Sequence, residues 1–317
     1  MPTDDIYAKG QEWRSRIRAL SEAVWEGHAK EQVVQDWLNG FVGAVCDAET
    51  ERYYALYLLH QFIYFGQAEI DALLYSMFRD HILYPQVQHS LELNPSLNDD
   101  EIKCALEEAV AKMRIIPVGD VSESAAMLSY RLRQIAGLPP EAIRTMGEVL
   151  AELKRDESSI THVVLTDDFL GTGDQLCEKH NDQVKQLASL GVQVDYVALV
   201  GMQRGLEKVR SGHLFNNVNA VVMLDHSYSL SCSPCVHMNE LDDDCPPLSS
   251  AECLRIIRHY GGHLLRGHPM GYKDCGVMVG FNHNTPDNSV PIFWVRSKPH
   301  RWTPIFERHN KVGEFRA

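Results

Sequence analysis

The chain has no stretch of 18 or more consecutive apolar residues, and its first residues, MPTDDIYAKG, are polar and acidic. We therefore expect neither a membrane span nor a secretory signal. Cations are also in the minority, since 30 lysines and arginines stand against 43 acidic residues, for a formal net charge of −13. Such a chain has no broad basic face for a phosphate backbone, so we expect no direct nucleic-acid binding.

The eight cysteines are scattered through a chain of 317 residues that is 44% hydrophobic. A chain of this size can bury a core without disulfide bonds, so we expect reduced cysteines and a cytoplasmic location. The one cluster, Cys232, Cys235, His237 and Cys245, has one Cys-x-x-Cys pair but no second pair. A zinc site usually needs both pairs, so we favour an ordinary reduced loop over a structural zinc ion.

Hydrophobic periodicity predicts a helical first part. Apolar residues recur at helical spacing throughout residues 49–65, ETERYYALYLLHQFIYF, and again in AEIDALLYSMFRDHIL. Asn98, followed by three acidic residues, is typical of a helix start. The aromatic residues of this part follow core spacing, with few cations between them, which favours helix packing over base stacking. We predict an all-helical domain over residues 1–112.

The pattern changes after residue 112, where short apolar runs alternate with amphipathic segments. This alternation predicts a parallel sheet covered by helices on both faces, in a Rossmann-like α/β domain over residues 113–317. The predicted strands are MRIIPVG, HVVLT, VQVDYVALV and NAVVMLD, with two further strand-like pieces, CGVMVGF and VPIFWV. The predicted helices are SESAAMLSYRLRQIAG, PPEAIRTMGEVLAELKR, DQLCEKHNDQVKQLASLG, QRGLEKVRSG and SSAECLRIIRHYG.

The segment VVLTDDFLGTGDQL combines a strand, two acids and a glycine turn. Asp167 and Asp168 follow the apolar run, at the strand end where open α/β sheets bind ligands. The turn 171–173 then leads into a helix near Asp174, and its glycines and the helix N-terminus favour a bound phosphate. Carboxylates beside a phosphate make sense when they hold ribose hydroxyls or Mg²⁺. The segment therefore predicts a site for a sugar phosphate.

The same segment resembles the phosphoribosyl pyrophosphate motif of type I phosphoribosyltransferases. Positions that match are Asp167, Asp168, Thr172 and Gly173. Asp174 and Gln175 depart from it, because they replace the usual Gly-Thr end of the phosphate cradle. Three further segments, PVGDVSESAAMLSYRLR, HYGGHLLRGHPMGYKDCG and FNHNTPDNSVPIFW, resemble a phosphoribosyltransferase-like family of bacterial conflict and anti-phage systems, some of them retron-associated.

The resemblance implies a phosphoribosyltransferase-like fold, an N-glycosidic transfer or cleavage reaction, and a role as a defence effector. It implies a nucleotide or phosphoribosyl substrate. The large apolar helical domain predicts a docking face for a protein of the defence system or for a second copy of the chain, and an acidic chain could join a nucleoprotein through a basic partner. By this resemblance Asp167 and Asp168 act in catalysis, on ribose hydroxyls and Mg²⁺. The ribose- and phosphate-binding positions that it implies are Gly171, Thr172, Gly173, Asp174, Gln175, Ser122 and Ser124.

Three other interpretations of the segment stay open. The acids and glycines could form a plain strand-turn-helix connection. The segment also partly matches the opening of Rossmann-type methyltransferases, although those have glycine where this chain has Leu170. The third is a non-catalytic module that binds a nucleotide signal or a partner, which Asp174 and Gln175 favour and the acid pair disfavours. A Walker phosphate loop is excluded, because no Gly-Lys-Ser/Thr follows the glycines.

Overall fold

The computed structural model describes residues 2–118, 123–155, 159–239, 241 and 249–308. The chain forms two compact units. Unit 2 is the continuous segment Glu69–Leu224, whereas unit 1 combines both ends of the chain, Met1–Ala68 and Asp225–Ala317. This division differs from the predicted boundary at residue 112. No helix of the described residues has the length and apolar character needed to cross a membrane.

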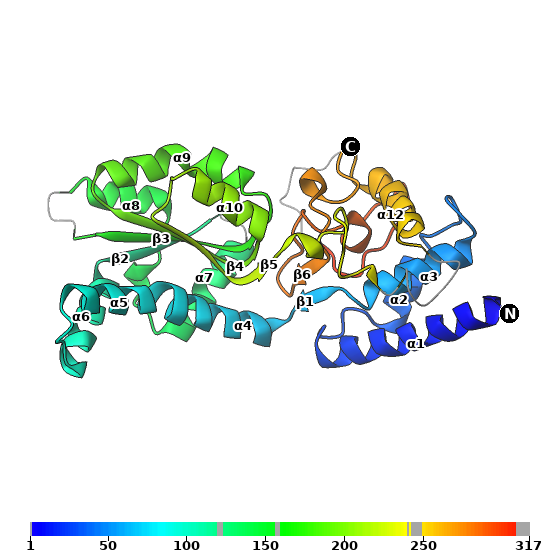
Figure 1. The fold of residues 1–317 in the computed structure, drawn as a ribbon, viewed down its shortest axis with the longest axis horizontal. Helices are drawn as coiled ribbons and strands as arrows, with labels where there is room; N and C mark the ends of the chain where they lie inside the picture. The colour runs from blue at the N-terminus through cyan, green and yellow to red at the C-terminus, as the bar shows by residue number, and fades with distance from the viewer. Residues whose placement is uncertain (1, 119–122, 156–158, 240, 242–248, 309–317) are drawn as a thin grey trace. The chain divides into compact units, whose positions relative to one another are not determined.

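Unit 2 is an α/β layer structure around a four-stranded parallel sheet of order β2-β3-β4-β5. Helices α8, α9 and α10 cover one face, and α4, α5 and α7 lie on the other (Figure 1). This confirms the predicted parallel-sheet α/β fold. Its helical elements are α4 (Gln67–Ser76, which begins in unit 1), the π-helical η1 (Met77–Leu83), α5 (Tyr84–Leu93), α6 (Asp99–Ala111), α7 (Glu123–Ala136), η2 (Pro140–Ala142), α8 (Met146–Leu153), α9 (Asp174–Ser189) and α10 (Gln203–Ser211). Its strands are β2 (Met113–Pro117), β3 (His162–Leu170), β4 (Gln193–Met202) and β5 (Asn217–Leu224).

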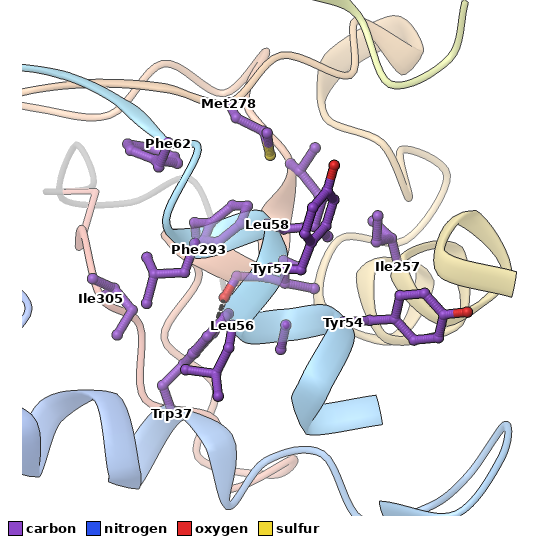
Figure 2. Packing of buried hydrophobic residues seen from close by; sticks show 14 of the residues in the cluster. Trp37, Tyr54, Leu56, Tyr57, Leu58, Phe62, Ile257, Met278, Phe293 and Ile305 are labelled. Atoms are coloured by element: carbon purple, nitrogen blue, oxygen red, sulfur yellow. Dashed lines mark hydrogen bonds between the residues drawn. The ribbon is translucent and has the colours of Figure 1, made fainter. Parts of the chain in front are cut away.

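Unit 1 is mainly helical, with a small parallel sheet of two strands. Its core contains large aromatic side chains from the N-terminal helices, which pack against residues from the C-terminal segment (Figure 2). Trp37 donates from Nε1 to the carbonyl of Ile292 at 2.7 Å, and Tyr57 donates from its hydroxyl to the carbonyl of His237 at 2.8 Å. The elements are α1 (Pro2–Ala23), α2 (Glu31–Leu38), α3 (Ala48–Leu59), β1 (Ile63–Phe65), η3 (His226–Tyr228), α12 (Ser250–Leu264), η4 (Tyr272–Asp274), β6 (Val279–Phe281) and η5 (Pro291–Phe293).

These contacts explain why the chain divides elsewhere than at residue 112. The aromatic residues of the N-terminal helices are buried, as their spacing predicts, but what buries them is the segment after Asp225. Periodicity shows that a face is apolar, and it does not show which distant segment covers that face. The helices of residues 69–111, by contrast, belong to the unit that contains the four-stranded sheet.

Three predicted elements differ from the structure. The helix predicted over residues 49–65 ends at Leu59, because β1 pairs with the distant strand β6. The helix predicted over residues 139–155 begins at Met146, since Thr145 and Glu148 form a capping box there. The piece VPIFWV contains the 3₁₀ turn η5 and no strand. The start predicted at Asn98 is confirmed, because its side chain caps α6 in a capping box with Glu101.

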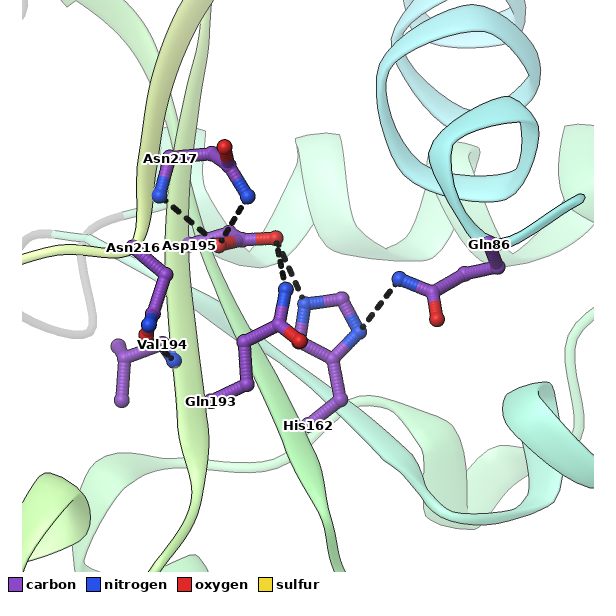
Figure 3. A network of polar contacts seen from close by, with 7 residues as sticks. All are labelled: Gln86, His162, Gln193, Val194, Asp195, Asn216 and Asn217. Atoms are coloured by element: carbon purple, nitrogen blue, oxygen red, sulfur yellow. Dashed lines mark hydrogen bonds and ion pairs between the residues drawn. The ribbon is translucent and has the colours of Figure 1, made fainter. Parts of the chain in front are cut away.

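A polar network around the buried pair His162 and Asp195 joins the starts of three strands at the amino edge of the sheet (Figure 3). Asp195 Oδ2 lies 2.9 Å from His162 Nε2 and accepts from Gln193 Nε2 at 3.1 Å. Its other oxygen accepts from the amide and the side chain of Asn217, both at 3.0 Å. Gln86 of α5 lies 3.4 Å from the second ring nitrogen of the histidine. This network fixes the register of β3, β4 and β5 far from the predicted site.

Candidate functional site

Asp167 and Asp168 lie in β3 at the carboxyl edge of the sheet. The neighbouring strand β2 ends at Pro117, which pairs with Thr166, so the two acids stand just beyond the end of β2. The strand continues to Leu170, four residues beyond the predicted segment HVVLT, because it still pairs with β4 there. The acids therefore lie where β2 has ended and β3 still pairs with β4.

A small open cavity of about 50 Å³ lies beside the two acids. Both acids line it, together with Thr166, Pro117, Val118 and side chains from α4, η1, β4 and α7. By the resemblance, the loop from Pro117 to Ser124 would occupy the pyrophosphate side, and the structure brings the acids together with Pro117 and Val118 at the start of that loop. The cavity is smaller than pockets that enclose a whole nucleotide, which typically have roughly 300–1,000 Å³.

The carboxyl group of Asp167 has two donors from the protein and an acidic neighbour. Asp167 accepts a hydrogen bond from the amide of Asp168 at 2.9 Å and another from the hydroxyl of Tyr196 at 3.2 Å. Burial raises the pKa of Asp167 well above its usual range, and the charge of the adjacent Asp168 raises this pKa further. A pair of this kind attracts a cation or a group of hydroxyls, because either relieves the repulsion between the two carboxylates.

The glycine turn after β3 is tightly packed and has unsatisfied amides. Gly173 has φ of +75°, a conformation that glycine adopts without strain, and it starts α9. Gly171 and Gly173 are buried, and within the described part of the chain no acceptor bonds to the amides of Gly171, Thr172 or Gly173. Buried amide donors without an acceptor are costly, and a bound anion would satisfy them.

The negative charge of Asp174, beside the turn, is paired with a lysine. Its carboxylate forms an ion pair with Lys208 of α10, whose side chain is 50% exposed. The acid that departs from the phosphoribosyl pyrophosphate motif is thus offset by a cation from a different helix. Gln175, the second departure, is exposed. Residues 171–175 are not among those lining this cavity, so the cavity beside the acids does not extend to the turn.

The turn is also held by close packing against α10. A Cβ atom at Gly205 would lie 2.4 Å from the carbonyl oxygen of Gly171, which is closer than real contacts allow. We expect Gly205→Ala to push the two segments apart and to lower the free energy of unfolding by about 2 kcal/mol. Gly147→Ala is the matched control, because that helical glycine has nothing within 4 Å of a new Cβ.

Far-ultraviolet circular dichroism during urea unfolding measures both effects. The control is expected to gain about 0.5 kcal/mol, since alanine favours helix over glycine. Equal stability of Gly205→Ala and the unchanged protein would contradict the close packing at the turn.

Several predicted positions can be placed only in part. Ser122 and Cys245 lie outside the described residues, and so does the side chain of Ser124, whose backbone belongs to α7. Cys232, Cys235 and His237 are described, and no group of three or more metal-binding side chains occurs in the part of the chain that the structure shows. Two residues that sequence reasoning missed also contact the predicted site, namely Lys208 and Tyr196.

The parallel sheet, with its acid pair and glycine turn at the carboxyl edge, defines an α/β protein of the class that binds ligands at strand ends. The chain belongs to the PRTase-CE family, a phosphoribosyltransferase-like family whose model matches residues 34–308. The match covers all of unit 2 and most of unit 1, and it confirms the predicted phosphoribosyltransferase-like family. No curated protein matches the chain.

Proposed function

We propose that the protein is an enzyme that transfers or cleaves the N-glycosidic bond of a phosphoribosyl or nucleotide substrate. The observation that carries this proposal is the cavity at the carboxyl edge of the sheet, which both Asp167 and Asp168 line beside the end of β2. Membership of a phosphoribosyltransferase-like family supports the same class of substrate.

The substrate's ribose would place its hydroxyls on the acid pair. The cavity of about 50 Å³ accommodates the hydroxyl edge of a sugar, so the base and the phosphates would lie outside it. The amides of residues 171–173 would donate hydrogen bonds to the 5′-phosphate. The resemblance assigns the pyrophosphate side to the loop from Pro117 to Ser124, of which residues 119–122 lie outside those described. Lys208 stands close to this phosphate position through its ion pair with Asp174.

The donor set fits Mg²⁺. Magnesium is usually held by one or two carboxylates together with substrate oxygens, and Asp167 and Asp168 supply the two carboxylates. When bound, the ion would stabilise negative charge on the leaving group. The acid pair would meanwhile orient the ribose and stabilise positive charge on its ring as the glycosidic bond breaks.

Calorimetry tests binding and turnover together. The unchanged protein and the variant Asp167→Asn/Asp168→Asn are titrated with phosphoribosyl pyrophosphate and with nucleotides, with and without Mg²⁺. We expect binding that Mg²⁺ strengthens, and a loss of at least tenfold in affinity in the variant, because each missing charged hydrogen bond costs roughly 1.5–3 kcal/mol. Mass spectrometry of a nucleotide mixture after incubation detects the cleaved or transferred base.

The outcomes separate the alternatives. Binding without any change in the nucleotide mixture would favour the non-catalytic module that Asp174 and Gln175 suggest. Absence of binding to every nucleotide and to phosphoribosyl pyrophosphate would contradict both functions. Tyr130→Phe serves as the control variant, since Tyr130 is an exposed side chain of α7 that is not among the cavity's lining residues.

The proposed biological role is that of an anti-phage effector, which acts by depleting a nucleotide pool together with a protein or nucleoprotein partner. This role rests on the resemblance of the sequence to families from bacterial conflict systems. Phage plaque counts on cells that carry the intact system are expected to rise when Asp167 and Asp168 are both replaced by asparagine. Unchanged plaque counts would contradict the defence role without affecting the proposed chemistry.

A further inference from the structure

Tyr196 contacts Asp167 from the neighbouring strand of the sheet. It lies in β4, its side chain is fully buried, and its hydroxyl donates to Asp167 Oδ2 at 3.2 Å. The amide of Asp168 donates to the other oxygen of the same carboxylate at 2.9 Å. Both oxygens of Asp167 therefore accept a hydrogen bond from the protein itself.

The donors that hold Asp167 have little freedom to move. The ring of Tyr196 belongs to the hydrophobic core between the sheet and helices α8, α9 and α10, and its centroid lies 5.8 Å from that of Phe215. A phenolic hydroxyl is a neutral hydrogen-bond donor at ordinary pH, so Tyr196 donates to the carboxylate. The other donor is a backbone amide of β3, which is fixed by the strand.

We propose that Tyr196 is a positioning residue that fixes the carboxylate of Asp167, so that direct contact with the ribose falls mainly to Asp168. This inference rests on the proposed function and assigns different tasks to the two acids. An oxygen that already accepts a fixed hydrogen bond keeps one orientation and has fewer lone pairs for a ligand. Asp167, once fixed, holds the adjacent Asp168 in position beside the cavity that both acids line.

A double-mutant cycle tests the positioning role. Tyr196→Phe removes only the hydroxyl and keeps the ring that the core needs. We expect it to weaken binding of ribose 5-phosphate with Mg²⁺ about tenfold and to leave binding of inorganic phosphate unchanged. In an Asp167→Asn background the same change is expected to cost less than twofold, because its effect passes through that carboxylate. A merely structural role would instead give additive effects.

The two acids are compared in the same assay. Asp168→Asn is expected to weaken ribose 5-phosphate binding at least tenfold more than Asp167→Asn does, and this comparison holds even if Tyr196→Phe folds poorly. Tyr130→Phe is the control for loss of a hydroxyl, since that side chain is 53% exposed.

Each result decides one question. If the unchanged protein binds no ribose 5-phosphate, the proposed function fails and the inference falls with it. If the unchanged protein binds and Tyr196→Phe binds equally well, the inference alone is overturned. Additive effects in the cycle, or equal losses from the two asparagine variants, would overturn it in the same way.

Discussion

Replacing Asp195 with alanine is expected to lower the free energy of unfolding of unit 2 by about 3 kcal/mol. The carboxylate is buried and bonds to His162, Gln193 and Asn217, which come from three neighbouring strands. Its removal leaves the buried ring of His162 without its partner, and an unsatisfied buried group costs roughly 1–3 kcal/mol unless water reaches it. Loss of the network also frees the register at the amino edge of the sheet.

The measurement requires a probe of the correct unit. All five tryptophans lie in residues 13–37 and 294–302, so their fluorescence reports on unit 1. Amide hydrogen exchange in β3 and β4 follows unit 2 alone. Asp182→Ala on the exposed face of α9 is the matched control, with an expected change below about 0.5 kcal/mol. A similar small change in Asp195→Ala would show that the network contributes little.

Protonation of one buried histidine is expected to lower the free energy of unfolding of unit 1 by about 3 kcal/mol as the pH falls from about 6.5 to about 4. His237 is buried, and no hydrogen-bond partner for its Nε2 occurs in the described part of the chain. Burial lowers the pKa of His237 to about 4, whereas the unfolded chain has the ordinary value of about 6.5. Between these values the unfolded state binds a proton that the folded state does not, so acid favours unfolding.

The difference between two proteins isolates this effect. His237→Leu removes the titrating ring, so its stability relative to the unchanged protein should improve by about 3 kcal/mol between pH 7 and pH 4. Tryptophan fluorescence during urea unfolding at several pH values measures the difference, and other titrating groups cancel in the subtraction. Parallel pH profiles for the two proteins would show that the buried histidine is already charged or hydrated at neutral pH.

Local features of the sequence predicted most of unit 2. The alternation of apolar runs and amphipathic segments indicated the strand and helix order of the sheet, and Asn98 indicated a helix start that the structure confirms. These signals lie within about 15 residues of one another, so they need no knowledge of distant partners. The acids at the carboxyl edge followed from the same local pattern.

Features that depend on distant contacts could not be predicted. The short strand β1 reads as the end of a helix, because its partner β6 lies more than 200 residues away. The ion pair between Asp174 and Lys208 joins two helices, and no sequence pattern in either helix predicts it. Tyr196 stands at the start of the apolar run of β4, residues 196–202, so its hydroxyl was indistinguishable from ordinary core packing.

The assembly of unit 1 from both ends of the chain has a consequence for its synthesis. Residues 69–224 leave the ribosome as one continuous segment, so unit 2 can fold while translation continues. The aromatic helices that emerge first must wait for residues 225–308 before their apolar faces are covered. Nascent chains are therefore expected to need a chaperone until late in translation, and truncation at residue 224 should yield a soluble sheet carrying an aggregation-prone N-terminal segment.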